Sequence, residues 1–154
     1  AAIELDDRLM RTEYDRTIAL LATLDRPPRI TAPGGVQGPN VHVAFVADNV
    51  AKGISATPAI TLHASAAWSE AHWEHDTADV LASVIDLAGQ WLGDATIVEA
   101  HVKKWRFATP RTPWPDPCWV SADGAIVLAG DAFDGPRVEA AHNSGLAAAH
   151  TLLR

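Results

Sequence analysis

Four prolines within ten residues constrain the fold of this chain more than any other feature. They lie in residues 108–117 (ATPRTPWPDP). Each proline lacks a backbone N–H and has a fixed φ, so we expect no regular helix or strand in this stretch. The segment instead predicts a connection between two parts of the protein, residues 1–108 and residues 109–154.

The residues before the connection predict an antiparallel sheet that carries one main helix. Short β-rich runs bounded by turn residues are the candidate strands, at 17–24, 41–46, 59–63 and 95–107. Residues 25–38 hold three prolines and three glycines and predict a loop. Residues 76–93 predict a helix, because their apolar positions recur at helical spacing, with Asp76 or Thr77 as the cap and Gly93 at the end.

The residues after the connection predict a strand, a glycine-rich loop and a helix. A short strand at 118–121 and a turn at Asp123 and Gly124 precede the apolar run 125–129 (AIVLA), and a helix rich in small residues follows at about 138–153. A continuous apolar strand is typical of a parallel sheet covered on both faces. Asp131 follows this strand, where open α/β sheets bind ligands, and Gly130 would allow a close approach. A plain strand–helix crossover in which Asp131 caps a turn explains the same features. The chain as a whole predicts an α+β fold.

The segment LAGDAFDGPRVEAAHNSGLAAA (residues 128–149) resembles the C-terminal flavin motif of the flavoproteins with two dinucleotide-binding domains. More narrowly, the chain resembles the renalase-like, amine-oxidase-type FAD oxidoreductases. The resemblance includes KWRFA at 104–108, Glu74 and His75 before the main helix, and the pairs at 48–49 and 52–53. It therefore extends over nearly the whole chain, and it implies that residues 1–108 are part of a substrate-binding domain and residues 109–154 end a FAD-binding domain.

This resemblance implies roles for particular residues. Asp131 would hold the ribityl hydroxyls of FAD, with Gly130 allowing close approach. Arg137, Val138 and Glu139 would lie at the start of the last helix beside the flavin ring, where backbone amides stabilise negative charge. Trp105 and Arg106 are the catalytic candidates and would face the substrate side of the ring. For Trp105, the other interpretation is packing in the core. For Arg106, it is an exposed side chain that pairs with a carboxylate or a ligand phosphate.

The implied function is that of a FAD-dependent oxidase, in which hydride passes from a reduced substrate to flavin and oxygen reoxidises the flavin. The resemblance leaves two substrate classes open, isomeric dihydronicotinamide dinucleotides and amines. No GxGxxG motif follows an N-terminal strand, so we expect the C-terminal portion of a longer flavoprotein that alone neither binds FAD tightly nor turns over. The small-residue face of the last helix would then favour a homodimer or a domain swap. The alternative is a non-catalytic domain that binds a small molecule or a protein.

Charge and composition exclude several other classes. The net charge of −7 argues against a nucleic-acid or anionic-membrane partner, and no apolar run approaches the length of a membrane span. The single cysteine, Cys118, excludes an internal disulfide and favours a reducing, cytoplasmic location. We expect no metal at residues 70–76, because their two histidines and three acids lack an HExxH pattern and the neighbouring Trp68 and Trp73 indicate a surface helix. No GxSxG elbow supports a hydrolase, and the Ser144 hydroxyl is expected to bond the helix backbone four residues earlier.

Overall fold

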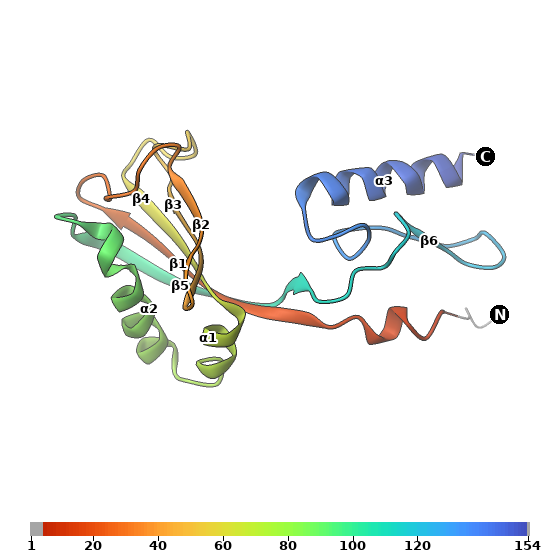
Figure 1. Cartoon of the computed structure of the whole chain (residues 1–154), viewed down its shortest axis with the longest axis horizontal. Coiled ribbons are helices and arrows are strands. Elements are labelled where there is room, and N and C mark those ends of the chain that lie inside the picture. Colours follow the sequence, from red (N-terminus) through yellow and green to blue (C-terminus); the bar gives the residue numbers. More distant parts are fainter. Residues whose placement is uncertain (1–4, 154) are drawn as a thin grey trace. The chain divides into compact units, whose positions relative to one another are not determined.

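The computed structural model describes residues 5–153 and divides the chain into two compact units. The sheet unit is the contiguous stretch Arg16–Arg106, and the terminal unit combines Ala1–Asp15 with Phe107–Arg154. Figure 1 shows the elements of both units. The predicted α+β fold class is confirmed. The division into a substrate-binding and a FAD-binding domain stays a prediction, and its residues 1–4 and 154 lie outside the described part.

Five antiparallel strands form the main sheet, in the order β2-β3-β4-β1-β5. Their bounds are β1 Tyr14–Leu24, β2 Gly35–Asn40, β3 Val43–Asp48, β4 Ala59–Ala64 and β5 Ile97–Pro110. In the centre of the sheet, Leu21 of β1 lies opposite Thr61 of β4. Hydrogen bonds from Asp25 N–H to the Thr96 carbonyl (3.0 Å) and from Arg111 N–H to the Glu13 carbonyl (2.8 Å) close the two ends of the β1–β5 pair.

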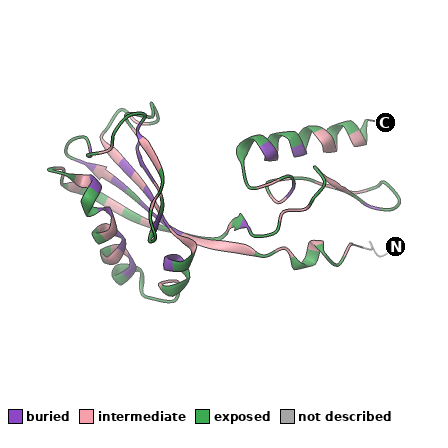
Figure 2. Ribbon diagram, in the orientation of Figure 1, coloured by how far each residue is buried: buried purple, intermediate pink, exposed green. Residues whose placement is uncertain are grey.

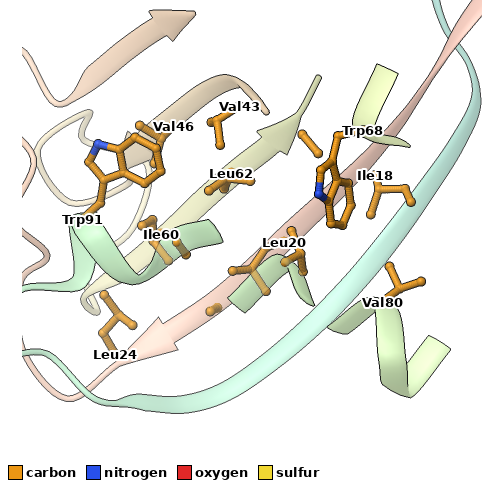
Figure 3. Close-up of a cluster of buried hydrophobic side chains, with 14 residues drawn as sticks. Ile18, Leu20, Leu24, Val43, Val46, Ile60, Leu62, Trp68, Val80 and Trp91 are labelled. Atoms are coloured by element: carbon orange, nitrogen blue, oxygen red, sulfur yellow. The ribbon is translucent and has the colours of Figure 1, made fainter. Parts of the chain in front are cut away.

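Two helices, α1 Ala66–Ala71 and α2 Thr77–Leu92, cover one face of this sheet. Alternate strand residues such as Ile18, Leu20 and Leu62 are fully buried and meet the apolar stripe of α2, whose buried members are Val80, Val84, Ala88 and Trp91. Figure 3 shows these side chains converging from the strands and helices on one core. The apolar residues that alternate along the strands therefore pack against the apolar residues that recur every 3.6 positions along α2, in a single hydrophobic layer.

The main helix follows its prediction closely. It begins at Thr77 after Asp76, whose side chain makes no capping bond, and ends before Gly93, which has a φ of +61°. The surface helix indicated around Trp68 is α1, and its buried residues are Trp68 and Ser69. Ser65 caps α1 by accepting the Trp68 N–H (3.3 Å).

The terminal unit contains the short 3₁₀ helix η1 Leu9–Arg11, the hairpin β6 Trp119–Val120 and β7 Val127–Leu128, and the helix α3 Val138–Leu152. Trp119 pairs with Leu128 in an antiparallel register, and Gly124 has a φ of +71° in the predicted turn. The expected strand at 125–129, covered on both faces in a parallel sheet, is wrong. Only two of its residues are in a strand, both are half-buried, and their partner is the antiparallel β6.

Two further boundaries differ from the sequence prediction. The stretch 108–117 was expected to hold no regular structure, but residues 108–110 belong to β5. β5 is an edge strand, and an edge tolerates Pro110 because one side of the strand needs no partner. The predicted loop 25–38 was also too long, since β2 begins at Gly35 and pairs with β3.

Candidate functional site

The chain turns sharply after β7 at residues 130–135, which we call the glycine–aspartate corner. Gly130 has a φ of +149°, and Asp134 and Gly135 also have positive φ values, of 62° and 107°. Side-chain-bearing residues rarely adopt the conformation of Gly130. A Cβ atom on Gly130 would meet nothing within 4 Å, so backbone conformation rather than crowding requires this glycine, and open space lies beside it.

A buried serine of α3 holds the corner in place. The Gly130 N–H donates to Ser144 Oγ (2.9 Å), and the Ser144 side chain is fully buried. Ala140, one turn earlier on the same helix face, is also buried. The sequence prediction, which gave the Ser144 hydroxyl a bond within its own helix, missed this role, because the partner is fourteen residues away.

The proline segment forms the other support of the corner. Trp114 N–H donates to the Ala132 carbonyl (2.7 Å), and the Asp134 N–H donates to the Trp114 carbonyl (3.3 Å). Trp114 thereby forms a parallel bridge with Phe133, whose side chain is buried. The corner is therefore fixed on one side by the Ser144 hydroxyl and on the other by backbone hydrogen bonds of Trp114.

The Asp131 side chain is exposed at this corner. Within residues 5–153 no ion pair involves its carboxylate. Burial raises the pKa of the Tyr14 hydroxyl above its ordinary value, and the negative charge of Asp131 adds to this shift. Tyr14 packs edge-on against Phe107, with 5.7 Å between the ring centroids. Asp131 thus presents both carboxylate oxygens as acceptors near an aromatic pair.

The predicted residues at the start of the last helix are all exposed. Arg137 is the N-cap residue of α3 and makes no side-chain capping bond, while Val138 is 90% exposed and Glu139 lies in the first turn. The first backbone amides of a helix have no partner within it, and they favour electron-rich groups. Gly130, Asp131, Arg137, Val138 and Glu139 all belong to the terminal unit.

The two catalytic candidates lie on β5 in the sheet unit and point to opposite faces. Trp105 is half-exposed, and the Lys103 ammonium lies 5.4 Å from the centroid of its indole ring. The Lys104 ammonium bonds the carbonyls of Trp73 (2.6 Å) and His75 (3.1 Å), between α1 and α2. Because successive strand residues alternate, Arg106 shares the side of Lys104 and Trp105 shares that of Lys103. A ligand on one face can therefore contact only one of the two.

The face of the sheet away from the helices carries polar residues that the sequence did not single out. A hollow of about 160 Å³ lies there between β4, β1 and β5, lined by Leu21, Thr61, Glu99 and His101 among others. His101 Nε2 is 3.0 Å from Glu99 Oε1. The sequence signal that could have identified this pair is the spacing of two residues between Glu99 and His101 on a predicted strand, because this spacing places both side chains on one face.

Other site classes receive no support from the described residues. Residues 5–153 contain no group of three or more metal-ligating side chains. In the same range, no helix combines the length and the apolar character needed to cross a membrane. Comparison with protein-family models and with curated proteins finds no match to this chain.

Proposed function

We propose that this chain contributes the ribityl-binding corner and the substrate-side sheet of a FAD-dependent oxidoreductase of the renalase-like or amine-oxidase type. The observation that carries the proposal is the exposed Asp131 carboxylate on a corner that the Gly130–Ser144 hydrogen bond holds in shape. A carboxylate is an acceptor only, and it suits the hydroxyl donors of a ribityl chain. The open space beside Gly130 fits a ligand that approaches the backbone closely.

Each predicted residue has a task in this proposal. The amides of the first α3 turn stabilise negative charge on an electron-rich ring edge, and Val138 offers apolar contact beside them. Bound FAD supplies the hydride acceptor. In the sheet unit, Trp105 lines the substrate side, and Arg106 on the opposite face pairs with a carboxylate or a phosphate. We place the protein in the cytoplasm on the strength of its single cysteine.

A second function is favoured by a different observation, the hollow on the open face of the sheet. Its lining combines apolar Leu21 with the hydrogen-bonding groups of Thr61 and His101. Such a mixture is typical of small-molecule sites. In this second proposal the sheet unit binds a small molecule without catalysis, and Asp131 has no part in binding.

The reading frame upstream of Ala1 separates the two proposals cheaply. A strand–GxGxxG–helix segment in frame supports the flavoprotein, because it supplies the pyrophosphate site. A start codon at this point supports the binding domain. Purified alone, the 154 residues should be colourless and inactive with FAD, and a yellow, flavin-retaining preparation would contradict that expectation.

The decisive variant is Asp131→Ala in the protein that includes any such upstream segment. We expect its FAD content after purification to fall at least about tenfold, because several charge-assisted hydrogen bonds are lost. Asp116→Ala, which removes another exposed carboxylate of the same unit, is the matched control and should retain FAD. Equal flavin absorbance in the wild type and Asp131→Ala would refute the proposal.

A further inference from the structure

A separate cavity of about 370 Å³ lies in the terminal unit. We call it the arginine pocket. Its lining consists of Arg8, Arg11, Thr12, Thr112, Trp114 and the prolines on either side of Trp114. Among the described residues that line it, the two arginines are the only charged ones, although the whole chain carries a net charge of −7. The pocket therefore departs from the acidic character of the chain.

Arg8 is held in a fixed orientation at the wall of this pocket. Its Nε and Nη2 atoms donate to the two Asp6 carboxylate oxygens at 3.0 and 2.8 Å. Its guanidinium lies over the Trp114 ring, 4.4 Å from the centroid. The hydrogen bond from Arg8 lowers the pKa of Asp6 to about 2, so the pair is ionised at neutral pH. This geometry leaves Nη1 of Arg8 for a ligand and spares much of the ordering cost of binding.

Arg11 supplies the second cation. Within the described part of the chain, it forms no ion pair. Beside Arg11, the Thr12 hydroxyl donates to the Leu9 carbonyl (3.1 Å), so the Thr12 hydroxyl oxygen can act only as an acceptor for a ligand. The backbone bonds between Trp114 and residues 132–134 fix the main chain that carries the indole of the flat wall. The pocket therefore combines one guanidinium paired with Asp6, one available guanidinium and an aromatic surface.

We propose that the arginine pocket binds a small organic anion that joins a flat ring to a phosphate or a carboxylate. The ring packs on the prolines that flank Trp114 and on the part of the indole that the Arg8 guanidinium does not cover, and the anionic group accepts hydrogen bonds from Arg11 and from Nη1 of Arg8. Planar guanidinium groups match both kinds of anion. Ring-bearing amines carry the wrong charge for this lining. The site is distinct from the acidic glycine–aspartate corner, and its argument does not depend on the proposed flavin chemistry.

Protein-observed NMR with small probes tests this assignment on the chain itself. Phenyl phosphate and benzoate carry the two candidate anions on the same ring, and benzylamine reverses the charge. The Trp114 indole N–H signal, identified by its loss in Trp114→Phe, should shift saturably with one or both anions and not with benzylamine. The better anion distinguishes a phosphate site from a carboxylate site. Inorganic phosphate alone should bind more weakly than phenyl phosphate, because it lacks the ring.

Arginine variants provide the second arm of the experiment. Arg11→Gln should weaken binding of the better anion about tenfold, the size expected for one charge-assisted hydrogen bond. Arg26→Gln, which removes an exposed arginine of the sheet unit, is the control and should bind as the wild type does. Added salt should weaken wild-type binding. The proposal is overturned by a non-saturable Trp114 shift with both anions, by equal binding of benzylamine, or by an Arg11→Gln variant of wild-type affinity.

Discussion

Different interactions stabilise the interior of each of the two units. In the described residues, every buried hydrophobic side chain except Phe133 and Ala140 belongs to the sheet unit (Figure 2). The terminal unit relies on backbone hydrogen bonds around Trp114 and on the Ser144 hydroxyl. The glycine–aspartate corner and the arginine pocket both lie in this second unit. Polar geometry, rather than apolar burial, thus shapes these two candidate ligand sites.

Each unit contains one fully buried serine that accepts a backbone N–H. In the sheet unit, Ser69 of α1 accepts the Ile18 N–H of β1 at 2.9 Å. In the terminal unit, Ser144 of α3 accepts the Gly130 N–H at the same distance. The same interaction fastens a helix to a hydrophobic core in one unit and to a ligand-facing turn in the other. The comparison can be tested by removing equivalent groups from both units.

Removing a leucine should produce the largest difference. Leu62 is fully buried in the core of the sheet unit, whereas Leu128 of β7 is only half-buried. Leu62→Ala should lower the free energy of unfolding by about 2–5 kcal/mol, because it leaves a cavity. Leu128→Ala should lower it by about 1 kcal/mol, since less apolar surface is lost. Urea denaturation followed by circular dichroism measures both, and equal losses would contradict the proposed difference between the units.

Substitution of the two serines should give effects of intermediate size, global in the sheet unit and local in the terminal unit. Ser69→Ala leaves the buried Ile18 N–H without a partner and should lower the free energy of unfolding by about 1–3 kcal/mol. Ser144→Ala should act locally, accelerating hydrogen exchange at the Gly130 amide while the urea midpoint of the sheet unit stays unchanged. Each variant is the control for the other. A slow Gly130 amide in Ser144→Ala would show that other contacts hold the corner.

Substitution of His63 should give the smallest effect, which is visible only in the pH dependence of the free energy of unfolding. Burial lowers the pKa of His63 below its ordinary value, and the nearby Lys52 charge lowers it further. The unfolded chain therefore binds a proton at higher pH than the folded chain does. The free energy of unfolding should fall as the pH drops below about 6.5, and His63→Gln should reduce this slope. Urea titrations from pH 7.5 to 5 would measure it, and an unchanged slope would remove His63 from the comparison.

Local pattern was enough to predict most of the sheet unit. The helical spacing of residues 76–93 predicted α2, and the runs at 17–24 and 59–63 fall within β1 and β4. These elements bury the face that their own periodicity marks, so neighbouring sequence carries the information. The turn at Gly124 was predicted for the same reason, since a positive φ favours glycine.

The terminal unit was harder to predict, because its geometry depends on distant partners. The apolar run 125–129 suggested a long buried strand, but within residues 5–153 its only strand partner is the two-residue β6. The bonds from Gly130 to Ser144 and from Trp114 to Ala132 join residues that no short-range pattern connects. The sequence singled out Gly130 and Asp131 as candidates only, and it gave no sign of the support of their corner or of the arginine pocket.

The discontinuous composition of the terminal unit has a consequence for synthesis on the ribosome. The sheet unit is one contiguous stretch, Arg16–Arg106, and its core is complete once that stretch has emerged. The terminal unit joins segments from before and after the sheet unit. The contact of Arg8 with Trp114 and the hydrogen bond of Gly130 to Ser144 therefore form only after the later residue of each pair has been synthesised. Domains generally fold in the order in which they are translated. Of the two units, the one that bears the glycine–aspartate corner and the arginine pocket is therefore the later to mature.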